Sequence, residues 1–132
     1  MKTAAVVIGR NEGARLVACL EGLQGKVTQV VYVDSGSTDG SVAVAGGLGA
    51  KVTPLDMNVP FTAARARNAG LAALETGTEF VQFLDGDFVI REDWLKTATV
   101  FLSNTPQAAV VCGRRRERFP QVSVYNGLID AA

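Results

Sequence analysis

The stretch "EFVQFLDGDFVI", residues 79–90, is an apolar run that ends in two aspartates, Asp85 and Asp87, one glycine apart. The run predicts a strand over residues 80–84. Buried carboxylates are costly unless a positive group neutralises them. The pair therefore has two interpretations: a metal site at the end of a strand, or an Asp-Gly turn that reverses the chain between two strands.

Short β-branched runs alternate along the rest of the chain with segments of helical spacing, as in β-α-β sheets. Strands are predicted over residues 4–8, 29–33, 51–55, 80–84 and 108–112. Helices are predicted after Asn11, after "STD" at 37–39, over residues 62–75, and from Glu92 and Asp93 onward. Strands that are apolar on both faces predict an α/β fold, a Rossmann-like and mostly parallel sheet with helices on both faces.

Two of these helices carry apolar stripes that are expected to face the core. The first stripe consists of Leu16, Val17, Leu20 and Leu23, and the second of Trp94, Ala98, Phe101 and Leu102. Because Trp94 lies on the second stripe, it is expected in the core rather than as a platform for a sugar.

Composition limits the function classes. The chain has 132 residues, with 13 Lys plus Arg against 13 Asp plus Glu, which favours one domain over residues 1–132 and argues against a disordered tail or a bulk nucleic-acid binder. Cys19 and Cys112 lie in apolar stretches of a chain without histidine, and both are predicted to be buried thiols. The apolar runs are too short for a signal peptide or a membrane helix, so a soluble, cytoplasmic protein is expected.

Polar residues gather where the predicted strands end. Gly9–Glu12, Asp34–Gly36 and Asp85–Asp87 follow three different strands, and ligands of open parallel sheets bind outside such carboxyl ends. The segment "GRNEG" fits neither GxGxxG nor GxxxxGK[ST], which argues against an ordinary dinucleotide or P-loop site. A divalent cation can hold a diphosphate instead, because Mg²⁺ and Mn²⁺ bridge carboxylate and phosphate oxygens.

The ordered segments "VVIGRNEG", "VVYVDSGSTDGS", "ARARNAG" and "FLDGD" resemble the nucleotide-sugar-binding half of inverting family 2 glycosyltransferases with the GT-A fold, over residues 3–118. The resemblance implies that Asp34 contacts the base or ribose and that Arg67 approaches the base or diphosphate. It implies a nucleoside pocket lined by Ile8, Arg10 and Glu12. It also implies that Asp85 contacts the ribose or the metal and that Asp87 binds the metal, Mn²⁺ or Mg²⁺. Ser35 stands where many members have a second acid, in "VDDGS".

The same resemblance implies a UDP- or GDP-sugar donor and a saccharide, lipid or protein acceptor. Family members carry an acidic catalytic base further along the chain, often in a Glu-Asp pair, and neither Glu117 nor Asp130 sits in such a motif. No catalytic residue is therefore assigned, and the chain is expected to be the donor-binding part of a larger enzyme, with self-association through uncovered faces. Peripheral contact with the inner membrane face is an alternative to a purely cytoplasmic location.

Other interpretations stay open. The chain fits a non-catalytic nucleotide-sugar-binding module, or an α/β interaction domain without a ligand. A sugar-phosphate nucleotidyltransferase would need a Gly-rich, Lys-bearing loop after the first strand, which "GRNEGARL" does not provide. Asn11 and "STD" suit helix caps as well as ligand contacts. Arg65 and Arg67 suit a solvated helix face, and the run Arg114–Arg116 with Arg118 suits a solvated strand extension or contact with an acceptor phosphate or anionic lipid.

Overall fold

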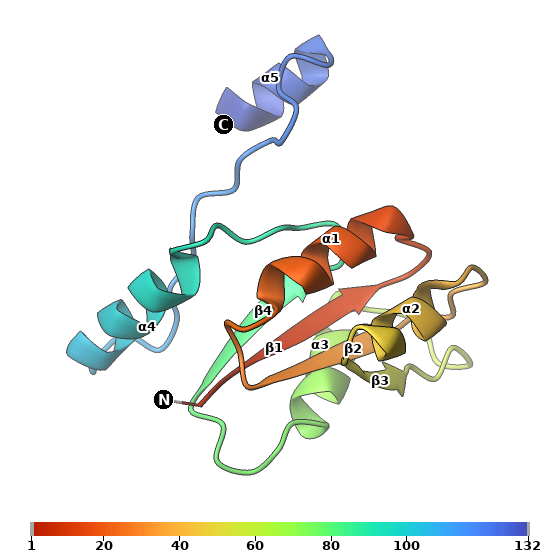
Figure 1. The fold of residues 1–132 in the computed structure, drawn as a ribbon, viewed down its shortest axis with the longest axis horizontal. Coiled ribbons are helices and arrows are strands. Elements are labelled where there is room, and N and C mark those ends of the chain that lie inside the picture. The colour runs from red at the N-terminus through yellow and green to blue at the C-terminus, as the bar shows by residue number, and fades with distance from the viewer. Residues whose placement is uncertain (1, 132) are drawn as a thin grey trace. The chain divides into compact units, whose positions relative to one another are not determined.

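A computed structural model describes residues 2–131, apart from the side chains of Ile129 and Asp130. The chain divides into two compact units, Met1–Leu95 and Lys96–Ala132, and each is described by itself. Figure 1 shows the elements in chain order.

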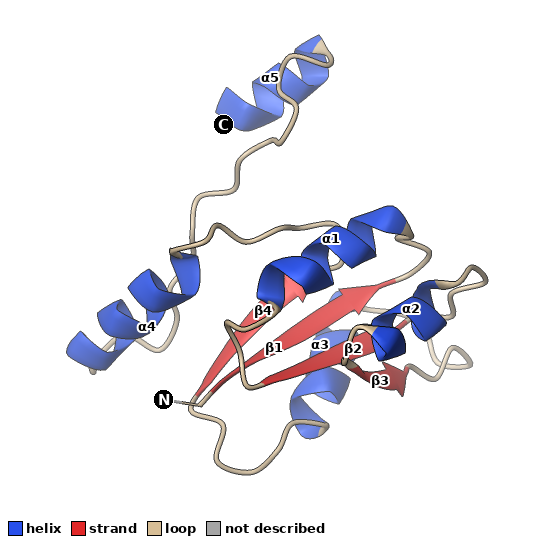
Figure 2. Ribbon diagram, in the orientation of Figure 1, coloured by secondary structure: helices blue, strands red, loops and turns tan. Residues whose placement is uncertain are grey.

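The first unit contains a parallel sheet of four strands in the order β3-β2-β1-β4 (Figure 2). The strands are β1 (Thr3–Gly9), β2 (Gln29–Asp34), β3 (Lys51–Pro54) and β4 (Phe80–Asp85). The helices of the chain are α1 (Ala14–Leu23), α2 (Ser41–Gly47), α3 (Ala63–Ala72), α4 (Trp94–Asn104) and α5 (Val124–Ala131). The α/β class and the parallel sheet predicted from the sequence are confirmed.

Helices cover both faces of the sheet, because successive residues of a buried strand point to opposite sides. Ala5 and Val7 of β1 pack in one apolar cluster with side chains of α1 and α2. Val6 and Ile8 pack in a second cluster with Ala66 of α3. Figure 1 shows the corresponding three layers, with α1 and α2 on one face and α3 on the other.

The predicted apolar stripe of α1 is largely correct. Leu16, Leu20 and Leu23 are buried, and Cys19 joins them. Val17 is only half-buried, because its place on the helix lies at the margin of the face that meets the sheet. Burial raises the pKa of the Cys19 thiol to about 12, with smaller contributions from the negative charges of Asp87 and Asp85.

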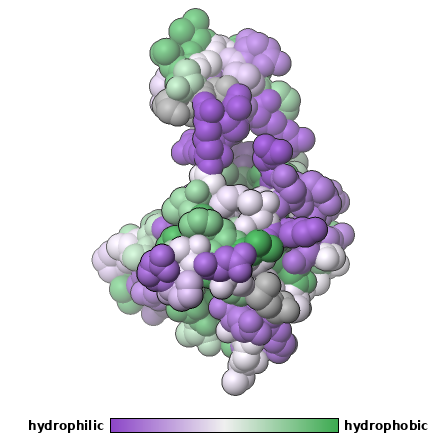
Figure 3. Space-filling model, turned by 90° about the vertical axis from the view of Figure 1, so that its left-hand side faces the viewer, coloured by the Kyte–Doolittle hydropathy of each residue, from purple (hydrophilic) through white to green (hydrophobic). Residues whose placement is uncertain are grey.

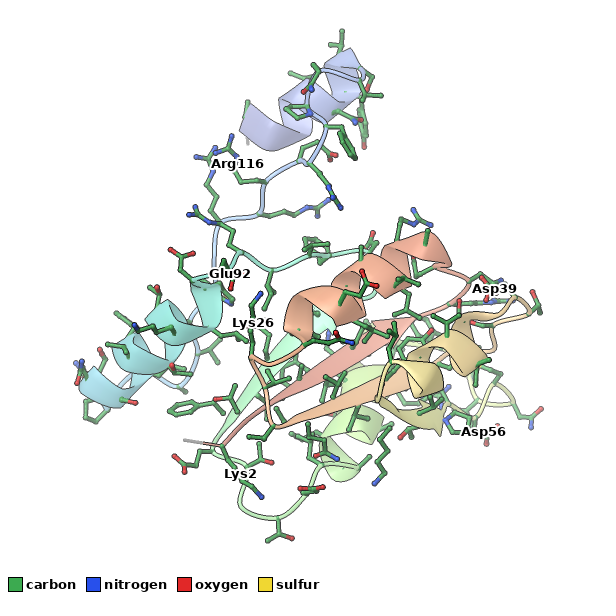
Figure 4. The ribbon with its side chains drawn as sticks, in the orientation of Figure 1. Lys2, Lys26, Asp39, Asp56, Glu92 and Arg116 are labelled. Carbon is green, nitrogen blue, oxygen red and sulfur yellow. The ribbon has the colours of Figure 1, made fainter. Side chains whose placement is uncertain are left out.

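The start of α4 anchors the end of the first unit. The indole N–H of Trp94 donates a hydrogen bond of 2.6 Å to the side-chain oxygen of Gln82 on β4, and Trp94 packs against the cluster that contains Leu95. Trp94 therefore belongs to the core, as predicted. Phe101 of the predicted stripe is 47% exposed, so its placement in the core is wrong. Lys26 and Glu92 form an ion pair of 2.9 Å in the same unit (Figure 4).

The predicted strand over residues 108–112 is wrong. These residues carry no strand assignment, and Val110 is 74% exposed. A strand requires a partner edge, and the described residues of the unit Lys96–Ala132 contain no other strand. Cys112 is consequently exposed, which corrects its prediction as a buried thiol.

The second unit ends in α5, and its surface mixes polar and apolar side chains. The guanidinium of Arg118 lies 5.5 Å from the centre of the Phe119 ring, a cation–π distance. The arginine run does not extend a strand, because residues 111–117 are irregular. Hydrophilic and hydrophobic residues are interspersed over the face shown in Figure 3.

No helix within residues 2–131 is both long enough and apolar enough to span a bilayer.

Candidate functional site

A cavity of about 440 Å³ lies at the carboxyl edge of the sheet in the first unit. Its lining includes the following residues predicted for the site: Ile8, Arg10, Glu12, Arg67, Asp85 and Asp87. These residues come from the end of β1 and the segment after it, from α3, and from the end of β4 and the turn after it. They converge because the carboxyl ends of parallel strands meet at the same edge.

The Asp85-Gly86-Asp87 segment is a turn, but it does not make a hairpin. The Phe88 N–H donates to the Asp85 carbonyl at 3.0 Å, and the Gly86 N–H donates to the Ile8 carbonyl at 2.8 Å. Among the described strands, β4 pairs with β1 alone, so the hairpin interpretation is wrong. A Cβ at Gly86 would lie 3.3 Å from the Ile8 carbonyl oxygen, so glycine allows the turn to sit against β1.

The positive group beside Asp85 is Arg67. Its Nη2 lies 3.0 Å from Asp85 Oδ1, and the two side chains are 40% and 48% exposed. Arg65, two residues earlier, has a different role. Its Nη2 donates to the carbonyls of Asp56 and Val59 at 2.7 and 2.9 Å, which ties down the loop before α3. The interpretation of both arginines as solvated charges is therefore wrong.

Asp34 is buried and fully hydrogen-bonded within the protein. Its Oδ1 accepts from the hydroxyls of Tyr32 and Ser37, and its Oδ2 accepts from the Ser37 N–H. Burial raises the pKa of Tyr32, and its hydrogen bond to Asp34 adds to the effect. Asp34 does not appear among the described residues that line the cavity. Its predicted contact with the base or ribose stays a prediction.

Asn11 fastens the loop after β2 and does not cap α1. Its side-chain oxygen accepts from the N–H groups of Thr38 and Asp39, and its own N–H donates to Ser37 Oγ. Asn11 has a left-handed backbone with φ of 52°, and the residue before α1 is Gly13, without a side-chain cap. The cap prediction for Asn11 is wrong, because its side chain bonds across to the second loop instead.

The "STD" loop is held by a second aspartate. Asp39 Oδ1 accepts from the N–H of Ser41, the first residue of α2, at 2.9 Å. Hydrogen bonding to Ser41 lowers the pKa of the Asp39 carboxyl. Asp39 was predicted to cap α2, and its side chain does bond to the first N–H of that helix. The N-cap position itself, directly before the helix, is occupied by Gly40. Figure 4 labels Asp39 in this loop.

Two polar atoms at the cavity are buried without a hydrogen-bond partner among the described residues. One is Oγ of Ser35, a residue only 4% exposed, and the other is Oε2 of Glu12. Glu12 Oε2 lies 3.1 Å from Arg15 Nε, an ion pair without hydrogen-bond geometry. Both residues line the cavity, and a buried polar atom without a hydrogen-bond partner beside a cavity is a feature of ligand sites.

The residues present fit a metal ion that is shared with a ligand rather than one held by protein alone. Within residues 2–131 there is no group of three or more side chains that would hold a metal. Mg²⁺ and Mn²⁺ at phosphate sites, however, commonly take one or two carboxylates and complete their shell with phosphate oxygens and water. Asp85 and Asp87 both line the cavity and are the residues there that would supply two such carboxylates.

Sequence reasoning missed the apolar side of the cavity, formed by Met57 and Phe61. Both lie in the loop between β3 and α3, and they are 42% and 50% exposed. The available signal was two large apolar side chains inside the turn-rich segment "DMNVPFT". Isolated apolar residues in loops are common, so the signal was weak without the fold.

This combination defines a class: an α/β nucleotide-diphosphosugar-binding fold of the GT-A type, with its cavity at the carboxyl edge of a parallel sheet. Residues 4–128 match the family described as Glycosyl transferase family 2, and the chain belongs to this family. The resemblance seen in the sequence is confirmed.

Solved structures agree with this assignment. S. aureus TarS is 26% identical and superposes with a TM-score of 0.66 over 90% of this chain and 24% of its own. Glucosyl-3-phosphoglycerate synthase from Mycobacterium tuberculosis is 28% identical, with a TM-score of 0.58 over 77% of this chain and 39% of its own. That synthase was crystallised with Mn²⁺, UDP and glucosyl-3-phosphoglycerate.

A curated relative is also a glycosyltransferase. An uncharacterized glycosyltransferase from Rickettsia felis is 45% identical over 51 residues. The match covers 39% of this chain and 18% of that protein. The chain therefore spans well under two thirds of the length of the proteins it resembles.

Proposed function

We propose that this chain binds a nucleotide-diphosphosugar in the cavity and forms the donor-binding part of an inverting glycosyltransferase. One observation carries the proposal: a cavity at the carboxyl edge of the sheet is lined by the Arg67–Asp85 ion pair and by Asp87. It joins a cation that suits a diphosphate to carboxylates that suit a divalent metal. The UDP and Mn²⁺ in the related M. tuberculosis synthase support the same ligand class.

The site residues have distinct roles in this proposal. Ile8, Arg10 and Glu12 border the nucleoside, and Asp34 contacts its base or ribose once the loop after β2 adjusts. Arg67 lies in the cavity and donates to the diphosphate. Asp85 serves the ribose or the metal.

Asp85 and Asp87 would hold the metal, Mn²⁺ or Mg²⁺. When bound there, such an ion supplies positive charge next to the diphosphate as it leaves. The chain's own part is to orient the donor. Arg67 fixes the diphosphate by a charge-assisted hydrogen bond, and the turn at Gly86 keeps both carboxylates at the cavity.

In the reaction, an acceptor hydroxyl attacks the anomeric carbon from the face opposite the diphosphate, and the configuration inverts in one step. The hydroxyl loses its proton to a carboxylate base. No residue is assigned as that base. Glu117 lies in the unit Lys96–Ala132, and the side chain of Asp130 lies outside the described part of the structure. A saccharide, lipid or protein acceptor and a cytoplasmic location, with peripheral membrane contact as the alternative, belong to the same proposal.

Calorimetric titration with UDP and with GDP, each with and without Mn²⁺, tests the proposal. We expect one nucleotide to bind in a Mn²⁺-dependent manner and Asp87→Ala to lose that dependence, because a carboxylate ligand is removed. Asp93→Ala is the matched control, since Asp93 lies on the same segment and outside the cavity lining. Absence of binding by both nucleotides under every condition would contradict the proposal.

A further inference from the structure

We propose that Met57 and Phe61 form the surface on which the base of the donor nucleotide stacks, an inference that rests on the proposed function. Neither residue belongs to the motifs that carry the family resemblance. Both line the cavity, and both are about half-exposed. Large apolar side chains that face an open cavity mark the part of a ligand that is itself flat and apolar.

The order of strands sets the direction in which a nucleotide lies. The sheet order is β3-β2-β1-β4, so residues that directly follow each strand lie in that sequence along the edge of the sheet. Ser35 follows β2, Arg10 and Glu12 follow β1, Asp85 ends β4 and Asp87 comes after it. Met57 lies beside Gly36, because a Cβ at Gly36 would be 3.2 Å from Met57 Cγ, and Phe61 shortly precedes α3, which packs against β1 and β2. Neighbouring strands are about 4.8 Å apart, so the end of β2 lies roughly 10 Å from the end of β4.

The two ends of the cavity differ in chemistry. The β4 end carries two carboxylates and the guanidinium of Arg67, which suit a metal-bound diphosphate. The side of the cavity formed by Met57 and Phe61 offers a thioether and an aromatic ring. These groups suit the face of a heterocyclic base and give a diphosphate no partner. Ser35, whose hydroxyl has no hydrogen-bond partner among the described residues, gives the polar edge of the base a partner at the same end.

The loop that carries Met57 and Phe61 is held in place before any ligand arrives. Arg65 donates to the carbonyls of Asp56 and Val59 within the loop. The Thr62 hydroxyl accepts from the Arg65 N–H and caps α3 directly after Phe61. A preorganised surface binds a ligand with a smaller entropic cost, which favours a binding role over accidental exposure.

The test compares two ligands and two phenylalanines. The probes are the nucleotide that binds, UDP or GDP, and inorganic pyrophosphate, each with Mn²⁺. Phe61→Ala is expected to weaken nucleotide binding about tenfold and to leave pyrophosphate binding unchanged, because only the nucleotide has a base to stack. Phe61→Leu keeps the apolar character without the ring, so its affinity for the nucleotide should lie between those of the unaltered protein and Phe61→Ala. Phe83→Ala is the control, since Phe83 is 39% exposed and lies outside the cavity lining.

The outcomes separate this inference from the proposed function. If Asp87→Ala weakens both ligands but Phe61→Ala binds the nucleotide as the unaltered protein does, the stacking surface is overturned and the donor site stands. An equal loss for nucleotide and pyrophosphate in Phe61→Ala would also overturn it, because it would show a general distortion of the cavity. If neither nucleotide binds the unaltered protein, both proposals fall. Circular dichroism of each variant checks that it is folded.

Discussion

At the residue scale, two aspartates end the strands on either side of β1 and are neutralised in different ways. Asp34 accepts hydrogen bonds from Tyr32 and Ser37 and is almost fully buried. Asp85 is half-exposed and pairs with the guanidinium of Arg67. A half-exposed ion pair is worth about 0–1 kcal/mol, so Asp85 can exchange its partner at little cost. A buried, satisfied carboxylate such as Asp34 exchanges its partners at a higher cost, because hydrogen bonds to Tyr32 and Ser37 must first be broken.

This difference leads to a prediction for Arg67→Met. Removing the guanidinium frees Asp85, so the affinity for Mn²⁺ alone should rise by about two- to fivefold, in line with the worth of an exposed pair. Affinity for the nucleotide in the presence of Mn²⁺ should fall, because the diphosphate loses a charge-assisted hydrogen bond. Both affinities are measured by calorimetry.

Arg91→Met provides the control for Arg67→Met. Arg91 is 84% exposed and pairs with Asp93 at 3.6 Å, outside the cavity lining. The Arg91→Met substitution should leave the affinities for Mn²⁺ and for the nucleotide unchanged. If Arg67→Met lowered the affinity for Mn²⁺ and for the nucleotide together, the competition between Arg67 and a metal for Asp85 would be refuted.

At the scale of elements, α3 lies close to the sheet because of one glycine. A Cβ at Gly70 would collide with Val6 Cγ1 and would approach Val33 Cγ2 to 3.0 Å. Gly70 is buried, and α3 also carries Arg67. The height of α3 above the sheet therefore sets how far the Arg67 side chain reaches over the edge.

Gly70→Ala is accordingly predicted to destabilise the protein by about 1–3 kcal/mol, the usual cost of forcing a methyl group into a packed core. Gly46→Ala is the matched control in α2, where a Cβ meets no atom within 4 Å. There the substitution should be neutral or stabilising by roughly 0.5–1 kcal/mol, because alanine favours the helix. Urea unfolding of both variants measures the free energies. An unchanged midpoint for Gly70→Ala would argue against close packing of α3.

At the scale of the whole molecule, the two cysteines report on separate parts of the chain. Cys19 is buried in the first unit, and Cys112 is exposed in the second. At about pH 8, iodoacetamide should modify Cys112 in the native protein and Cys19 only after denaturant is added, because the thiolate is the reactive form. The protein with Cys112→Ser should therefore resist modification. Rapid labelling of that variant without denaturant would show that the first unit opens readily.

The thiol of Cys19 makes the stability of the folded protein depend on pH. The pKa of Cys19 rises from 9.0 to about 12 on folding, so the folded protein retains a proton that the unfolded chain loses. Stability from this group is complete below about pH 9 and is lost as the pH rises toward about 12. Urea midpoints measured across this range should fall for the unaltered protein and fall less for Cys19→Ala.

The sequence by itself determined the class of fold and predicted several of the residues that line the cavity. β-Branched runs separated by helical segments predicted the parallel sheet, and polar residues at the strand ends predicted where Asp85, Asp87 and Arg10 would meet. These features are local, because each depends on the period of a short segment and on the residues that follow it. The part of the chain that matches the family, residues 4–128, contains these segments.

Only the tertiary structure decided which side chains pair across the chain. It separated Arg67, which meets Asp85, from Arg65, which holds the loop with Phe61, although both lie on one helix. It replaced the expected strand at 108–112 with irregular chain and brought Met57 and Phe61 to the cavity. The physical reason is that a pairing partner, a neighbouring strand or a shared cavity is set by distance in space, which no local period of the sequence encodes.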